Sequence, residues 1–243
     1  MKFNVKAIAA AALLAATGSS FAQVALNNTT NPDVYFAAFD AGAQIGFVLD
    51  TNIGWNSLTT GFNFSYDLDN SAAWNSFKAA AQGNSASTGI QWGVYSGKTG
   101  TDQGFLVGNG SATTSPVISA ANASTVRGII NSNAVAGNAV GNSDTGVFVT
   151  TNTIAPGINQ LGDFSTRLSW DSTQHYVTGV PASENLFKYT IAATQTNLFV
   201  GTASVDAGNV LSVAAPVPEP GTYALMFAGL MTLGAVARRR SRG

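Results

Sequence analysis

The last 27 residues, 217–243, place three chemically different segments in a row. Two prolines in 217–220 fix their own φ and disfavour helix at the residues before them, so this part should be extended. Residues 221–237 carry no charge, and as a helix they would measure roughly 25 Å, the lower end of what crosses a bilayer. Because this stretch has no polar face, we expect a membrane segment and not a buried helix of a soluble domain. It is followed by four arginines, Arg238, Arg239, Arg240 and Arg242.

These arginines indicate an orientation. Clustered basic residues remain on the cytoplasmic side of a membrane, so they should stop the helix there. The part of the chain before the helix would then lie outside the cytoplasm.

The first 22 residues have the pattern of a secretory signal peptide. Lys2 and Lys6 give a positive start, and residues 7–16 form an apolar run. Small side chains at Ser20 and Ala22 fit the −3 and −1 positions of a cleavage site. We expect export through the secretion translocon and cleavage by signal peptidase between Ala22 and Gln23. An amphipathic alanine-rich helix is the alternative, but no polar stripe accompanies the apolar run.

The C-terminal segment resembles the PEP-CTERM sorting signal. The resemblance rests on the motif, the short apolar helix and the basic cluster in this order, with the motif at Val217, Pro218, Glu219 and Pro220. It implies processing near the motif by an exosortase, an integral-membrane cysteine protease/transpeptidase of Gram-negative bacteria. It also implies a precursor anchored in the inner membrane, a mature form at the cell surface or outside the cell, and an association with exopolysaccharide and biofilm. The resemblance covers only about a tenth of the chain and assigns no role to the rest.

The chain thus divides into a signal peptide (1–22), an exported body (23–216) and the sorting signal (217–243). The body keeps only five of the eleven basic residues but eleven of the twelve acidic ones, so it carries about six negative charges. This balance excludes a basic nucleic-acid surface. The chain has no cysteine, which excludes disulfides, thiol catalysis and cysteine-bound metals. We expect no cofactor.

The body is predicted to be mainly β and sandwich-like. Large apolar and small polar residues alternate strictly in 62–68, the period of a half-buried strand, and the pattern recurs in 90–94 and 187–191. Residues 34–39 are apolar on both faces and predict a central strand, with 45–49 as its antiparallel neighbour. Weaker strand patterns occur at 105–107, 147–150, 198–200 and 210–213.

Two segments predict short helices that cover an end or one face of the sheets. Residues 71–82 carry an apolar stripe at helical spacing, with Asn70 or Ser71 as N-cap and Gly83 as the stop. Ser115 and Pro116 would begin a second helix, which ends near 131–137.

Catalytic chemistry is weakly encoded. His175 is the only histidine, with Asp171 four residues before it, but no Gly-x-Ser-x-Gly elbow provides an activated nucleophile. A surface or turn histidine explains the residue better. Glycoside hydrolysis needs two carboxyl groups across a cleft, and Glu184 is the only glutamate of the body, which leaves the aspartates. We therefore expect no enzyme.

Two binding chemistries remain open. Asp67 and Asp69 should point to the same side of a strand, where their oxygens could contribute to a calcium site; a turn that caps the following helix explains them equally. Aromatic side chains exposed on a sheet face could stack on sugar rings, although most aromatic residues belong to the core. The candidates are Trp92 and Trp170, with Trp55, Tyr95 and Tyr176 beside them.

The sequence therefore predicts a non-enzymatic, exported surface or matrix protein that is sorted by its C-terminal signal. A carbohydrate-binding module or adhesin is the nearest alternative. A secreted hydrolase that uses aspartates and His175 is a third, from another functional class.

Overall fold

The computed structural model describes residues 30–59, 62–99, 103–108, 146–150, 169–170, 173–174, 176–191, 196–215 and 226–232. The expected signal peptide and the helix expected from Ser115 lie outside these ranges.

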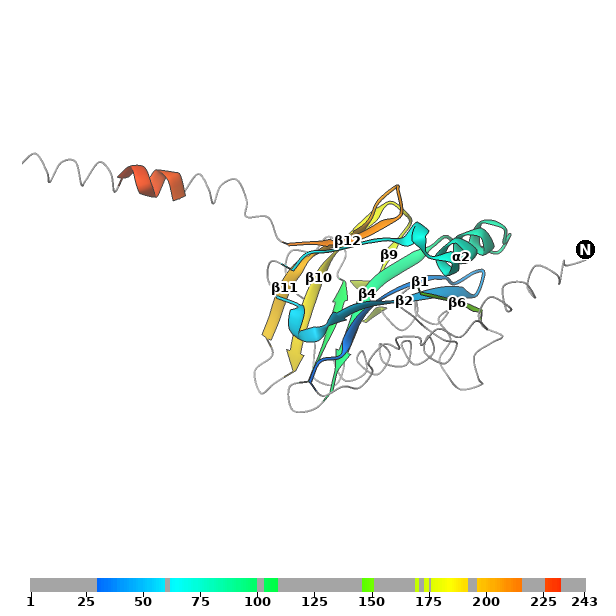
Figure 1. Ribbon diagram of the computed structural model, residues 1–243, viewed down its shortest axis with the longest axis horizontal. Helices are drawn as coiled ribbons and strands as arrows, with labels where there is room; N and C mark the ends of the chain where they lie inside the picture. Colours follow the sequence, from blue (N-terminus) through cyan, green and yellow to red (C-terminus); the bar gives the residue numbers. More distant parts are fainter. Residues whose placement is uncertain are drawn as a thin grey trace, which may run out of the picture.

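Most of the described body is one curled antiparallel sheet (Figure 1). Its path runs β3-β12-β11-β10-β5-β4-β1-β2-β6, and β9 pairs with β4 beside this path. The strands are β1 (Asp33–Asp40), β2 (Ile45–Gly54), β3 (Phe64–Asp67), β4 (Gln91–Lys98), β5 (Gln103–Gly108), β6 (Val147–Thr150), β9 (Val177–Thr178), β10 (Ala182–Ile191), β11 (Thr196–Val205) and β12 (Val210–Ala214). The short strands β7 (Ser169–Trp170) and β8 (Thr173–Gln174) pair separately.

The helical elements are few and short. Two single-turn 3-10 helices, η1 (Trp55–Ser57) and η2 (Leu68–Asn70), occupy connections, and α2 (Ala72–Gln82) is the one longer helix within the described part of the body. A further helical segment spans 226–232.

The hairpin of β1 and β2 confirms the expected central strand and its antiparallel neighbour. Phe36 pairs with Leu49 of β2 and with Val94 of β4, so β1 lies between two strands. Seven of its eight residues are buried, as the apolar character of both its faces requires. Alternate residues of β1 therefore point to opposite faces of the sheet, and both faces are buried at this strand.

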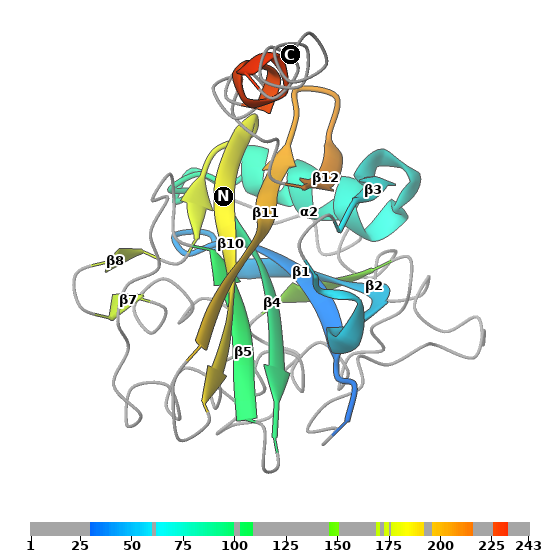
Figure 2. The same ribbon diagram turned by 90° about the vertical axis from the view of Figure 1, so that its left-hand side faces the viewer.

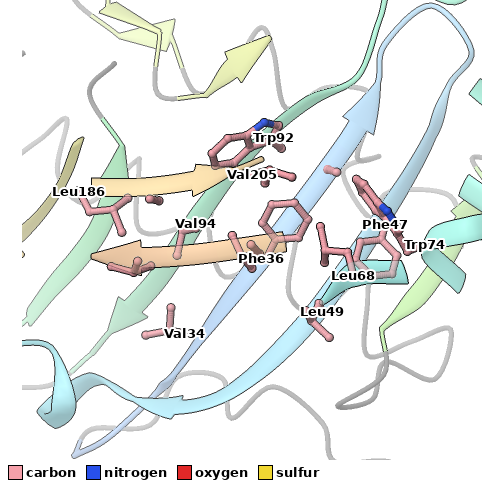
Figure 3. Packing of buried hydrophobic residues seen from close by; sticks show 14 of the residues in the cluster. Val34, Phe36, Phe47, Leu49, Leu68, Trp74, Trp92, Val94, Leu186 and Val205 are labelled. Atoms are coloured by element: carbon pink, nitrogen blue, oxygen red, sulfur yellow. The ribbon is translucent and has the colours of Figure 1, made fainter. Parts of the chain in front are cut away.

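The sheet curls so that its two ends enclose one core (Figure 1 and Figure 2). A small apolar cavity of about 10 Å³ is lined by Val34 of β1 and Leu211 of β12, which are distant along the strand order, and by Leu106 of β5, which lies between them in that order. Figure 3 shows Phe36, Phe47, Trp74 and Trp92 packed in this interior. The predicted sandwich is therefore realised as a single continuous sheet.

Helix α2 confirms the expected helix and closes the core. The Ser71 Oγ accepts a hydrogen bond from the backbone N–H of Trp74 at 3.1 Å, and Gly83 ends the helix by donating to the carbonyl of Ala79. The Trp74 ring centroid lies 6.0 Å from that of Phe36 and 5.3 Å from that of Phe47, both in edge geometry. These contacts fasten the helix to β1 and β2.

Strand boundaries differ from the sequence prediction where polar residues are buried or apolar residues leave the sheet. The strand predicted at 62–68 covers only Phe64–Asp67, since Leu68 turns into η2 while remaining buried. The strand predicted at 187–191 begins earlier, at Ala182. The buried Glu184 interrupts the apolar alternation there, so the pattern does not show the first half of β10.

We predict that Trp74→Ala destabilises the protein by about 3–5 kcal/mol, because it empties the contact between α2 and the central strands. Urea unfolding of the purified protein measures this change. Leu198→Ala is the control, since Leu198 is 36% exposed and its loss should cost much less. Equal losses for the two variants would contradict the assigned role of Trp74.

Candidate functional site

The C-terminal helical segment 226–232 is apolar and has no packed face. All seven of its residues are exposed, and Met231 is 74% accessible. The hydroxyl of Thr232, its one polar side chain, donates to the carbonyls of Ala228 and Gly229 at 3.1 and 2.7 Å, so it is satisfied within the helix. A helix that is apolar all round normally lies in a protein core or a membrane. This segment therefore has the surface of a helix that inserts into an apolar environment outside the body.

The structure does not test the length of that helix or the motif before it. Within the described residues, no helix is both long and apolar enough to span a membrane. The predicted sorting residues Val217–Pro220, the arginines from Arg238 to Arg242 and the cleavage site at Ala22 and Gln23 lie outside the described ranges. Their roles stay predictions.

The folded body continues almost to the sorting motif. Strand β12 lies between β11 and β3, with Ala214 opposite Thr202 and Val213 opposite Phe64. The backbone N–H of Ala215 then donates to Asn63 Oδ1 at 3.1 Å. The last described contact of the body is thus made only three positions before Pro218.

The sugar-stacking prediction for Trp92 is wrong. Its exposure is 0%, its ring lies 5.8 Å from that of Phe36, and its Nε1 donates to the carbonyl of Gly179 at 3.0 Å. The alternation in β4 directs Trp92 and Val94 into the core, where the ring faces are covered. Trp55, Tyr95 and Tyr176 are buried as well. The side chain of Trp170 is outside the described part, as is His175.

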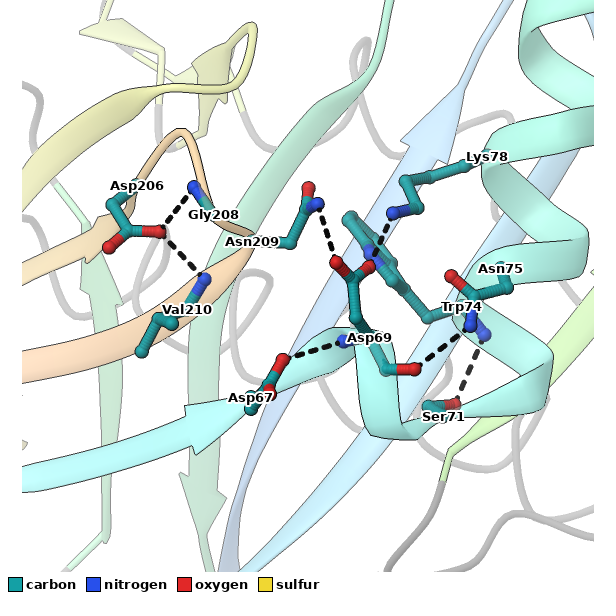
Figure 4. Close-up of polar contacts among 10 residues, drawn as sticks. All are labelled: Asp67, Asp69, Ser71, Trp74, Asn75, Lys78, Asp206, Gly208, Asn209 and Val210. Carbon is teal, nitrogen blue, oxygen red and sulfur yellow. Dashed lines mark hydrogen bonds and ion pairs between the residues drawn. The ribbon is translucent and has the colours of Figure 1, made fainter.

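Asp67 and Asp69 do not lie on the same side of one strand. Asp67 ends β3 and Asp69 belongs to η2, and the Asp67 carboxylate accepts a hydrogen bond from the Asp69 N–H at 3.0 Å (Figure 4). The two carboxylates therefore close a turn before α2, the other explanation of these residues. Among the described residues, no group of three or more histidines or carboxylates could hold a metal ion. The calcium hypothesis stays untested.

Asp69 is a junction of three elements. Its carboxylate pairs with Lys78 of α2 and accepts a hydrogen bond from Asn209 Nδ2 at 3.1 Å, in the turn between β11 and β12 (Figure 4). The hydrogen bond from Lys78 lowers the pKa of Asp69. Partial desolvation raises this pKa by less, and the hydrogen bond from Asn209 lowers it further. The interaction is exposed, so it positions the turn more than it stabilises the fold.

Asp40 organises a second turn. Its Oδ1 accepts hydrogen bonds from the backbone N–H groups of Gly42 and Ala43, both at 3.1 Å, and of Thr88 at 3.0 Å, while Ser87 donates to Oδ2. Burial alone would raise the pKa of Asp40, but these hydrogen bonds outweigh it and lower the pKa below its ordinary value. The carboxylate thereby joins the hairpin of β1 and β2 to the loop before β4.

Glu184 is the most unusual ionisable group of the described body. It is 1% exposed, its Oε1 accepts from the N–H of Val94 at 3.3 Å, and its Oε2 has no hydrogen-bond partner. The carboxyl group lies over Gly108, the last residue of β5, where a Cβ would come within 1.6 Å of Oε2. Burial raises the pKa of Glu184 well above its ordinary value, and the hydrogen bond from Val94 offsets this only in part.

The sequence reasoning did not identify Asp40 or Glu184 as structural groups. For Glu184 a signal was present: its period-two spacing with Leu186 puts it on the core face of its strand. For Asp40 the signal was the aspartate directly before an Ala-Gly turn, a common position for a carboxylate that caps backbone N–H groups.

We predict that Glu184→Gln gains stability relative to the wild type as the pH rises above about 4.3, the pKa of an unfolded glutamate. The folded state binds this proton more tightly than the unfolded chain, so the carboxyl group stabilises the fold below that pH. This contribution disappears as the pH rises toward the folded pKa. Urea unfolding at pH 4, 6 and 8 measures the difference.

Asp40→Asn is the matched control, because its carboxyl group has a lowered pKa and stabilises the fold in the ionised form. Its deficit should be largest at neutral pH and shrink in acid, the opposite trend. A stability difference between Glu184→Gln and the wild type that does not change with pH would contradict the buried, neutral state of Glu184.

Comparison with known proteins adds evidence for the C-terminal segment alone. A family model described as the PEP-CTERM protein-sorting motif matches residues 216–240. No curated protein matches the chain, and no solved structure matches it. The motif indicates an exported protein that is processed by an exosortase from a membrane-anchored precursor. The chain therefore carries a PEP-CTERM protein-sorting motif in its C-terminal part.

Proposed function

We propose that the body of this exosortase substrate is a non-enzymatic structural component of the cell surface or extracellular matrix, associated with exopolysaccharide. The observation that carries the proposal is the exposed apolar helix at 226–232, which lies within the matched motif and begins eleven positions after Ala215, the last described residue of a folded, β-rich body. An exposed apolar helix of this kind suits the membrane-anchored part of a precursor whose body lies outside. The chain is therefore organised for delivery of the body to the surface.

The use of charge in the body supports a structural role. Lys188 reaches into the connection after β2, where its Nζ donates to the carbonyls of Trp55 and Leu58 at 3.0 and 3.2 Å. The same ammonium lies 4.5 Å from the centroid of the Trp55 ring. Lys188, Asp40 and Asp69 thus each hold a turn or connection in place, and their charges serve the fold.

The two alternative functions have less support. Trp92 lies in the core, so it gives no support to sugar binding by stacked aromatic rings. A hydrolase would need a paired acid and base, and the one glutamate of the body is 1% exposed and, within the described part of the chain, accepts a hydrogen bond only from the backbone N–H of Val94. Neither alternative is favoured by a specific contact among the described residues.

Sorting is tested by replacing Pro218, Glu219 and Pro220 with alanine. We expect an unprocessed, membrane-retained chain, because the extended entry to the motif is lost. Immunoblots of membrane and culture fractions, with mass spectrometry of the C-terminus, measure the outcome. The double variant Asn197→Ala, Leu198→Ala at the exposed start of β11 is the control and should be processed normally. Normal processing of the triple variant would defeat the assignment.

The matrix role is tested by comparing two strains, one with exopolysaccharide and one without it. We expect the processed protein to sediment with the matrix in the first strain and to appear in the culture medium in the second. Quantitative immunoblots of both fractions measure the distribution. Retention that is the same without exopolysaccharide would contradict the association while leaving the sorting route intact.

A further inference from the structure

We propose that the fold of the body limits the processing of its own sorting signal: the end of β12 must detach from the sheet before the exosortase can cut. The proposal rests on the sorting function proposed above and adds a structural step that limits the rate of processing. The proposal follows from the contacts that hold the chain in place up to Ala215, the residue directly before the matched segment at 216–240.

The end of β12 is held on both sides. On one side Ala214 pairs with Thr202 of β11, and on the other Val213 pairs with Phe64 of β3. Val213 is 4% exposed and belongs to the core, so core packing also holds the strand in place. The strand cannot slide without uncovering apolar surface.

Two further contacts hold the last residues. Asn63 Oδ1 accepts the N–H of Ala215 at 3.1 Å, which extends the pairing beyond the strand itself. Gly201 of β11 lies so close that a Cβ there would come within 2.2 Å of the Ala214 carbonyl oxygen. The glycine therefore allows the end of β12 to lie tightly against its neighbour.

The distance to the motif is short. From Ala215 to Pro218 the chain makes three residue steps, which span at most about 10 Å even when extended. Proteins that recognise an extended peptide commonly bind several of its residues as an added strand. An enzyme that cuts near this motif would need residues of the β12 end, which the sheet already uses.

Cleavage should then depend on local opening. When opening and closing are fast compared with cutting, the cleavage rate follows the population of the open form. Opening here requires only the release of Ala214 and Ala215, so contacts at this end of β12 should affect the rate more than contacts elsewhere.

The test follows processing of the full chain by pulse labelling in exosortase-bearing cells. Asn63→Ala removes the acceptor of the Ala215 N–H and should raise the processing rate about threefold, which corresponds to about 0.7 kcal/mol at 1.4 kcal/mol per tenfold. A six-residue Gly-Ser spacer inserted after Ala215 adds about 20 Å of extended chain. It should raise the rate more than Asn63→Ala does, because detachment is then unnecessary.

Asp206→Ala is the control at the other end of β12. It removes the acceptor of the Gly208 and Val210 N–H groups, at 2.8 and 2.9 Å, and so loosens the turn but not the end near the motif. Urea unfolding establishes the stability lost by each variant. Asp206→Ala should be processed at the wild-type rate, and an acceleration equal to that of Asn63→Ala would overturn the proposal.

Unchanged or slower processing of either Asn63→Ala or the spacer variant would also overturn it. These outcomes are distinct from a failure of the sorting function. If the wild-type chain is not processed at all, the proposed function fails and this inference fails with it. If the wild type is processed and the spacer has no effect, only the inference fails.

Discussion

The contact of Trp74 with Phe36 and Phe47 is the interaction on which the arrangement of the body depends. The chain has no cysteine, so packing alone must hold its exported domain together. Other small secreted proteins reinforce their domains with disulfides. The three rings join α2 to the two central strands, with centroids 5.3 to 6.2 Å apart. Since β1 also pairs with β4, fixing α2 on β1 and β2 orients the sheet around the same interior.

Polar contacts then fix the connections that packing leaves open. Asp40 joins the first hairpin to the loop before β4, Asp69 joins η2, α2 and the last hairpin, and Lys188 joins β10 to the connection after β2. Each contact bridges segments far apart in sequence. A body with few charges thus uses several of them to set the positions of its turns.

The sequence allowed the fold class and many elements to be predicted, because their patterns are local. The period of two in 187–191 and the helical stripe of 71–82 reflect the faces that are buried in the structure. The alternation in 90–94 indicated a strand but not its burial, since β4 is buried on both faces. The curl of a single sheet could not be predicted, since it depends on β12 pairing with β3 across more than 140 positions. The burial of Trp92 was missed for a related reason: alternation shows that a residue lies on one face, but not which face is covered. The sorting motif could be identified because its signal lies in contiguous residues, whereas Asp40 and Glu184 act through distant partners.

The close approach of Glu184 to Gly108 has a consequence for variation between related chains. A Cβ at position 108 would lie 1.6 Å from Oε2, so a side chain at 108 would force the carboxyl group of Glu184 to move from its buried position. Acceptable changes at the two positions should therefore occur as pairs, with a small apolar residue replacing the glutamate wherever the glycine is lost. In such a pair the backbone N–H of Val94 would lose its acceptor, so another polar group would have to reach it from a neighbouring position.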